Sequence, residues 1–143
     1  MACLGKDLRK VFKKLFEFST AMETALKDKG RTFAKSSHLG YLSTCPSNLG
    51  TTLRVSGLVH LPKLSRRPDF RNVINELGLE LRGTHGEHTF GKLGIYDVSN
   101  VQRLGMTEVE IVNSFIDAVD KLITKEREEP LISTVDIVGI GSS

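Results

Sequence analysis

The stretch "GMTEVEIVNSFIDAVDKLI", residues 105–123, is the most regular segment of this sequence of 143 residues. Its apolar side chains recur every three or four residues, which is the period of an amphipathic helix. They are Val109, Val112, Phe115, Ile116, Val119, Leu122 and Ile123. Thr107 is followed three residues later by Glu110, the pattern of a capping box at a helix N-terminus. The stretch therefore predicts a long helix that begins after Thr107.

Two further segments have helical periodicity. Apolar residues recur at helical spacing from Leu4 to about Lys29, and Gly30 ends the pattern. A shorter helix is predicted between Pro68 and Gly78, because proline is favoured where helices begin and glycine where they end. The first segment has a basic outer face, so a helix that binds a membrane or a partner helix is one interpretation. Because acidic residues are interspersed, we expect a helix that packs on a core with a solvated back.

Four segments rich in leucine, valine and threonine predict strands. They are residues 39–43, 51–61, 79–81 and 94–98. The turn-forming residues Pro46, Ser47, Asn48 and Gly50 separate the first two segments. Strands in hairpin-like pairs, framed by helices and without regular βαβ alternation, predict an α+β fold with a mainly antiparallel sheet flanked by helices. We expect a domain over residues 1–129 and a flexible extra tail over residues 130–143.

The composition is that of one globular domain. Hydrophobic residues make up 39% and charged residues 26%, and no apolar run reaches the roughly 20 residues of a membrane span. The first residues do not show the charged and apolar pattern of a secretory leader, so we expect none, and two cysteines predict no disulfide framework. We therefore expect a cytoplasmic protein. The net charge of +3 does not distinguish nucleic acid, membrane and nucleotide as partners.

Cys45 is the first candidate for chemistry. It precedes Pro46, which favours an extended backbone at the mouth of a loop. Hydroxyl groups of Thr44 and Ser47 are available to hydrogen-bond a thiolate, and a cation such as Arg54 would lower the thiol pKa further. A buried, unreactive cysteine is the alternative.

Arg54 is the second candidate, since it lies in an otherwise apolar or hydroxyl-bearing segment, residues 51–59. An unpaired guanidinium is costly to bury, so Arg54 requires an anion. A carboxylate of the same chain would give it a structural role, whereas a phosphate would give it a binding role. The residues alone leave both roles open.

The segment "RGTHGEHT", residues 82–89, has the composition of a ligand-binding loop. Its glycines let backbone N–H groups approach a phosphate closely. His85, Glu87 and His88 leave a zinc site open, but their spacing and the neighbouring glycines do not suit a helical zinc motif. The sequence contains neither GxxxxGK[ST] nor GxGxxG after a predicted strand. We expect an anion-binding loop and no bound metal in the protein itself.

Five motifs occur in an order and at separations that are specific. They are "CPSNLGTTLR", "LPKLSRRPDF", "LELRGTHGEHT", "GIYDVSN" and "RLGMTEVEIV". Over roughly residues 5–128 the chain resembles the C-terminal catalytic portion of the phosphagen (ATP:guanido) kinases, closest to the arginine and taurocyamine kinases. The resemblance implies reversible transfer of the γ-phosphoryl group of ATP, as its magnesium complex, to a guanidine nitrogen. The implied partners are ATP or ADP and a small guanidino molecule, with no nucleic acid and no membrane.

The resemblance implies a substrate site at two residues. Cys45 matches the family's reactive cysteine, whose thiolate lies against the substrate guanidinium and helps to orient it. Glu87 matches a carboxylate that pairs with the guanidinium and takes its proton. Creatine kinases have "GTGGVDT" in this loop, with an apolar residue at the position of Glu87. The resemblance therefore favours arginine, taurocyamine or a related larger guanidine as substrate.

The resemblance also implies an ATP site. Arg54 and Arg82 match arginines that bind the phosphates, the loop from Arg82 to Glu87 matches a segment that closes over nucleotide and substrate, and Asp97 matches an aspartate near the nucleotide. The implied ATP-binding residues are Arg54, Val55, Ser56, Arg82, Gly83, Thr84, His85, Gly86, Glu87 and Asp97.

The sequence departs from the family at two positions of one strand. Leu58 stands where the family has a histidine near the adenine, and His60 stands where it has a lysine. The sequence also begins after the family's "NEEDH" segment and its N-terminal domain, so we expect a fragment with weak or no activity alone. The alternative is a noncatalytic module that binds nucleotide or pairs with a full-length kinase through a sheet edge.

Overall fold

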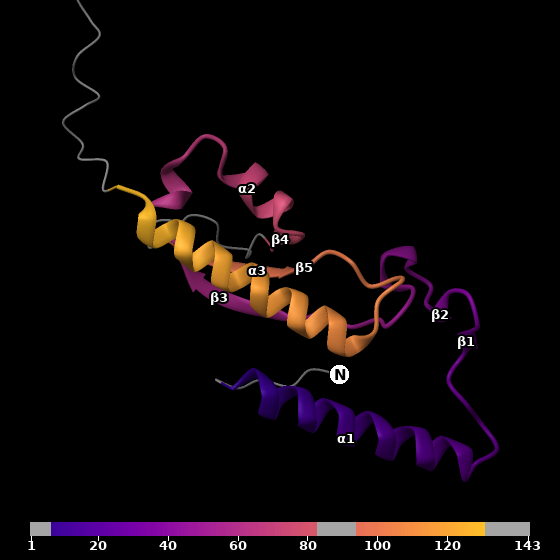
Figure 1. Cartoon of the computed structure of the whole chain (residues 1–143). Helices are drawn as coiled ribbons and strands as arrows, with labels where there is room; N and C mark the ends of the chain where they lie inside the picture. The colour runs from indigo at the N-terminus through magenta and orange to yellow at the C-terminus, as the bar shows by residue number, and fades with distance from the viewer. Residues whose placement is uncertain (1–6, 83–93, 131–143) are drawn as a thin grey trace, which may run out of the picture. The chain divides into compact units, whose positions relative to one another are not determined.

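The computed structural model describes residues 7–82 and 94–130, and the chain divides into two compact units, residues 1–42 and 43–143 (Figure 1). The first unit contains α1 (Leu8–Lys27), β1 (Lys35–Ser36) and β2 (Gly40–Tyr41). The second contains η1 (Pro46–Asn48), β3 (Ser56–His60), η2 (Leu64–Arg66), α2 (Phe70–Glu76), β4 (Leu79–Arg82), β5 (Ile95–Asn100) and α3 (Glu108–Glu128). Among the described residues, no helix is both long and apolar enough to cross a membrane.

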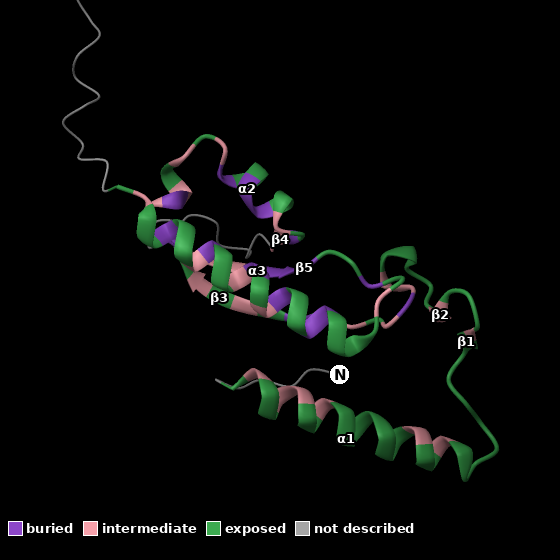
Figure 2. Cartoon of the chain, viewed as in Figure 1, coloured by how far each residue is buried: buried purple, intermediate pink, exposed green. Residues whose placement is uncertain are grey.

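The first helix, α1, forms where its periodicity predicts but begins later, at Leu8. The side chain of Asp7 accepts hydrogen bonds from the backbone N–H groups of Arg9 and Lys10, at 3.0 and 3.3 Å, which satisfies donors at the helix N-terminus. None of the described α1 side chains is buried (Figure 2), and the expectation that α1 packs on a core stays a prediction. In its unit the only other regular structure described is the β1–β2 hairpin, which has too little apolar surface to cover a helix face.

The β1–β2 hairpin contains part of the first predicted strand. Residues 39–43 were predicted as a strand without an assigned partner, and within them β2 pairs antiparallel with β1, so that Lys35 lies opposite Tyr41. The Lys35 ammonium lies 4.8 Å from the centre of the Tyr41 ring, and Phe33 meets the same ring edge-on at 6.1 Å. These contacts hold the two strands of the hairpin together. The periodicity of the sequence did not indicate them, since it shows only a short apolar run here.

The sheet of the second unit has the order β3–β5–β4 and is antiparallel throughout. Three of the predicted strands are therefore confirmed in type, and the α+β expectation with a mainly antiparallel sheet is confirmed. The segment predicted as a strand over 51–61 forms β3 only from Ser56 onward. Its first residues lead from the Cys45 loop into the sheet, and Thr52 there has φ of 55°, a left-handed conformation that interrupts strand geometry.

One face of this sheet is covered by α2 and α3 (Figure 1). A Cβ atom added at Gly57 would lie 3.8 Å from the ring of Phe115, so this face of β3 meets α3. Phe70 of α2 packs on Tyr96 of β5 with ring centres 5.1 Å apart. Buried side chains of this core include Leu61, Leu79, Val98, Ile111 and Leu122 (Figure 2).

The two helices of the second unit match their predictions closely. Thr107 and Glu110 form the predicted capping box, in which the Thr107 hydroxyl accepts from the Glu110 N–H and the Glu110 carboxylate accepts from the Thr107 N–H. Helix α2 ends at Glu76, and Gly78 follows with φ of 70°, as expected of a glycine after a helix. The expected boundary at residue 129 adjoins residues outside the described range and stays a prediction.

Candidate active site

Cys45 stands at the exposed entrance to η1, directly before Pro46, the first residue of that turn. The Cys45 backbone is extended, with φ −96° and ψ 118°, as a residue before proline requires. Its Sγ lies 2.9 Å from the Ser47 hydroxyl. Of the two alternatives that the sequence left open, the structure gives the exposed thiol and not the buried one, and of the two hydroxyls expected near the thiol, that of Ser47 makes the contact.

The pKa of the Cys45 thiol is lowered from its ordinary value. The hydrogen bonds from the Ser47 side chain and backbone are the main causes, and the positive charge of Arg103 adds to them. The cation expected in this role was Arg54, and this expectation is wrong. Arg54 is bound to a carboxylate elsewhere, whereas Arg103 reaches the loop from the segment between β5 and α3.

Arg103 contacts the Cys45 loop with both its side chain and its backbone. Its Nη1 donates to the carbonyl oxygen of Ser47 at 2.6 Å and to Oδ1 of Asn48 at 3.2 Å. Its carbonyl oxygen accepts from the N–H of Thr51 at 3.0 Å and from the Thr51 hydroxyl at 3.2 Å. A Cβ atom at Gly50 would lie 2.2 Å from that carbonyl oxygen, so only glycine allows this approach.

Arg54 pairs with Asp97, its Nη2 lying 3.1 Å from Oδ2 of that residue. The two side chains are 32% and 22% exposed, so the pair lies at the surface of the unit. The sequence left open whether Arg54 pairs with a carboxylate of the same chain, and the structure shows that it pairs with Asp97. In the described part of the chain this ion pair uses one guanidinium nitrogen, which leaves further N–H donors on Arg54.

The buried side chain of Asn100 fixes the backbone that carries Arg54. Its Oδ1 accepts from the N–H of Val55 at 2.8 Å, and its Nδ2 donates to the carbonyl oxygens of Leu53 and Gln102, at 3.2 and 2.8 Å. Neither Asn100 nor Arg103 was predicted from the sequence as a positioning residue. Both residues lie in motifs on which the family resemblance rests, and nothing else in the sequence indicated a role for them.

Two implied nucleotide-binding positions share one row across the sheet. Asp97 of β5 lies in register with Arg82 of β4 on one side and with Leu58 of β3 on the other. Because Gly57 faces α3 and successive residues of a strand alternate, this row lies on the face away from α3. Leu58 is 70% exposed there. Leu58, at the position where the resemblance implies a histidine, therefore lies directly opposite Asp97 of the Arg54–Asp97 pair.

Several predicted site residues lie outside the described residues. They are Gly83, Thr84, His85, Gly86 and Glu87. The zinc alternative involving His85 and His88 lies there as well. Among the residues that the structure describes, there is no group of three or more histidine, cysteine, aspartate or glutamate side chains able to hold a metal.

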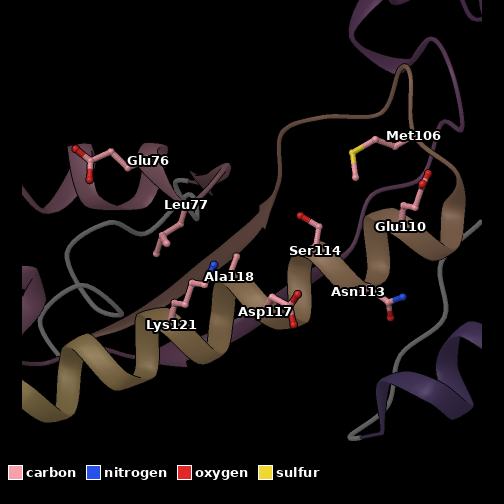
Figure 3. A pocket seen from close by; sticks show the side chains of 9 residues that line it. All are labelled: Glu76, Leu77, Met106, Glu110, Asn113, Ser114, Asp117, Ala118 and Lys121. Carbon is pink, nitrogen blue, oxygen red and sulfur yellow. The ribbon is translucent and has the colours of Figure 1, made fainter.

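An open hollow of about 440 Å³ lies between the end of α2 and the N-terminal half of α3 (Figure 3). Its lining combines carboxylates, amides and apolar groups: Glu76, Leu77, Met106, Glu110, Asn113, Ser114, Asp117, Ala118 and Lys121. None of the predicted site residues is among them. The hollow is therefore separate from the Cys45 loop and the Arg54–Asp97 pair.

Comparison with known proteins points to one family. Residues 2–129 match the family model described as ATP:guanido phosphotransferase, C-terminal catalytic domain. The chain is 43% identical over 122 residues to arginine kinase Oct f 2 of Amphioctopus fangsiao, and 46% identical over 123 residues to lombricine kinase of Eisenia fetida. These matches cover 85% and 86% of this chain but 34% and 33% of the relatives. The chain thus spans about a third of the length of the curated relatives it matches.

Solved structures agree with the sequence matches. The crystal structure of a lombricine kinase superposes with a TM-score of 0.78 at 42% identity, covering 86% of this chain and 34% of that chain. The substrate-free duplicated taurocyamine kinase of Schistosoma mansoni superposes with a TM-score of 0.73 at 40% identity, covering 85% of this chain and 17% of that chain. The antiparallel α+β architecture is thus shared with these structures.

Proposed function

The chain belongs to the ATP:guanido phosphotransferase family, and we propose that it carries part of a site where the γ-phosphoryl group of ATP is transferred reversibly to a guanidino substrate. In this reaction a guanidine nitrogen attacks the γ-phosphorus, the bond from that phosphorus to the β,γ-bridging oxygen breaks, and the nitrogen loses a proton. ADP and a phosphoguanidine are the products. The observation that carries the proposal is the exposed Cys45 thiol, which contacts Ser47 in a loop held by Arg103.

The thiol suits the guanidinium of the substrate. A lowered pKa increases the fraction of thiolate at neutral pH, and a thiolate attracts and orients a cation. We propose Glu87 as the second substrate residue and as the acceptor of the guanidinium proton, on the basis of the loop motif. The same motif supports arginine, taurocyamine or lombricine over creatine.

Arg54 and its surroundings suit the phosphates of ATP. Its side chain is partly exposed, and donors remain beyond the one bound to Asp97. We propose that a phosphate oxygen binds these donors and that Arg82 to Glu87 contribute further contacts, with Val55 and Ser56 supporting Arg54 at the start of β3. Mg²⁺ is proposed to arrive with ATP, bound mainly through phosphate oxygens as this ion prefers.

The reaction needs more charged partners than this chain contains in its described part. Because the loss of one preorganised donor typically slows such chemistry about 100-fold or more, we expect the chain of 143 residues to turn over slowly or not at all by itself. A cytoplasmic location stays a prediction from its cysteine usage.

A coupled assay of ATP consumption tests the proposal. Purified chain is supplied with MgATP and, separately, with arginine, taurocyamine, lombricine, creatine and glycocyamine. Cys45→Ser serves as the control. Turnover with one guanidine that is lost in Cys45→Ser supports catalysis and names the substrate. Turnover within tenfold of a full-length relative would contradict the expected weakness of this chain. Silence with every substrate from a folded chain would agree with that weakness and would show that the chain does not catalyse the transfer by itself.

A noncatalytic pairing module is the second candidate. In the described residues β3 and β4 each pair with β5 only, so each has one edge without a strand partner. Such edges are templates for pairing with another chain. Sedimentation of the chain alone and with a full-length kinase of the family tests this candidate. A well-folded monomer that does not associate with the kinase would count against it.

A further inference from the structure

The segment between β5 and α3 contains a buried arginine that the proposed reaction does not use directly. Arg103 is 8% exposed, yet no ion pair to it occurs within the described residues. Its Nε is buried and lacks a hydrogen-bond partner in the same residues. A guanidinium without a carboxylate is costly to bury, so its retention in this place requires a reason.

Its hydrogen bonds all reach one short loop far away in the sequence. Nη1 binds the Ser47 carbonyl and Asn48 Oδ1, and the Arg103 carbonyl binds the N–H and hydroxyl of Thr51. Ser47 is also the residue whose hydroxyl contacts Cys45 Sγ. A single arginine therefore fixes the carbonyl of the residue that orients the thiol.

The loop needs such support because its backbone is unusual. Gly50 has φ of 100° and Thr52 has φ of 55°, and the second conformation is unfavourable for a β-branched residue. The two bonds from Thr51 to the Arg103 carbonyl lie between these residues. Contacts from outside the loop thus hold a conformation that the loop would not adopt by local preference.

We propose that Arg103 is a positioning residue for the Cys45 thiol. It fixes the η1 loop with its guanidinium and carbonyl, and it places near the thiolate a positive charge that has no ion-pair partner in the described part of the chain. The inference deepens the proposed function, since that function uses the thiol. Arg103 itself touches no substrate in this proposal. The positive charge of Arg103 is one of the causes that lower the pKa of Cys45, after the Ser47 hydrogen bonds.

The experiment compares three variants of the full chain in a Cys3→Ser background, so that Cys45 is the one remaining thiol. Arg103→Met removes the charge and both side-chain bonds, whereas Arg103→Lys keeps the charge but not the planar fork. Arg67→Met is the matched control, because Arg67 also makes several polar contacts, to Asp69 and Glu129. The readouts are the pH midpoint of iodoacetamide alkylation and the amide hydrogen exchange of the η1 loop.

We expect the alkylation midpoint of Arg103→Met to rise by roughly half a pH unit or more, which is about a threefold change in the acid constant. Arg103→Lys should lie between this variant and the parent, and Arg67→Met should match the parent. The amides of Asn48 and Leu49, which bond within the loop to Cys45 and Pro46, should exchange faster in Arg103→Met.

An unchanged midpoint in folded Arg103→Met, or an equal rise in Arg67→Met, would overturn the proposal. If Arg103→Met does not fold, Arg103→Lys decides the question, and a parental midpoint with parental exchange in that variant would overturn it. Neither readout requires turnover. A chain that transfers no phosphoryl group therefore still tests the role of Arg103, and the two proposals can fail separately.

Discussion

Glu126 connects the last turn of α3 to the loop that follows β3. Its Oε1 accepts from the N–H of Lys63 at 2.9 Å, and its Oε2 accepts from the N–H of Leu64 at 2.8 Å. The side chain is 9% exposed. The helix dipole disfavours a carboxylate near a helix C-terminus, so Glu126 does not stabilise α3 through its charge. We therefore assign it the role of hydrogen-bond acceptor for the two backbone N–H groups at the start of η2.

Glu126→Gln keeps the shape of the side chain but leaves one oxygen as acceptor. One of the two backbone N–H groups then faces an amide nitrogen, and leaving such a donor unpaired away from water costs about 1–3 kcal/mol. Glu126→Ala removes both acceptors and should cost about twice as much. For a unit of about 100 residues, each kcal/mol lowers Tm by roughly 4–8 °C.

Urea unfolding followed by circular dichroism measures the effect, with an unchanged slope indicating that stability alone has changed. Glu128→Gln is the matched control, since it removes the same charge from an exposed position of the same helix turn. We expect that control to stay within about 0.5 kcal/mol of the parent. Equal losses at the two positions, or a loss below about 0.5 kcal/mol in Glu126→Gln, would refute the assigned role.

Three further predictions concern the loop, its close packing and the α3 cap. Ser47→Ala removes the hydroxyl 2.9 Å from Cys45 Sγ, so the thiol pKa should rise and the alkylation midpoint should move to higher pH; an unmoved midpoint would contradict this. Gly50→Ala and Gly78→Ala both place a side chain at positive φ, but only at Gly50 would the Cβ meet backbone atoms. By urea unfolding we expect about 1 kcal/mol of loss for Gly78→Ala and roughly 2 kcal/mol more for Gly50→Ala, with equal losses counting against the tight approach to Arg103. Hydrogen bonds from Thr107 lower the pKa of Glu110 below its usual 4.5, so their stabilisation is present above that pH and is lost as pH falls through the folded-state pKa. Glu110→Gln should flatten the stability curve below about pH 4.5, and a curve parallel to the parent would show that the cap does not contribute.

The sequence predicted those parts of the fold that local chemistry specifies. The capping box of Thr107 and Glu110 predicted the start of α3, and Pro68 with Gly78 predicted the place of α2. Both signals depend on residues within a few positions of each other. Strand pairing depends on contacts that periodicity does not show, and the sequence predicted neither β1 nor its pairing with β2.

The candidate site shows the same limit more sharply. The extended backbone of Cys45 and its contact with Ser47 lie within a turn of three residues and were predictable, whereas the exposure of the thiol was left open. The partner of Arg54 is 43 residues away, and Arg103 lies 56 residues from the Ser47 carbonyl that it binds. Composition suggests that an arginine needs an anion, but it does not say which of 17 acidic residues supplies it.

Asn100 and Arg103 connect two motifs that are distant in the sequence. Asn100 ends the motif "GIYDVSN", Arg103 follows it, and both bind residues of the motif "CPSNLGTTLR". Asn100 holds the backbone on either side of Arg54, and Arg103 holds the loop that begins at Cys45. Both residues lie at or just after the end of β5, so one strand end fixes the proposed phosphate-binding arginine and the proposed substrate-binding thiol. A shift of this strand end would move both groups at once. A substitution at Asn100 should therefore disturb Arg54, and one at Arg103 should disturb Cys45, although neither side chain is proposed to touch substrate.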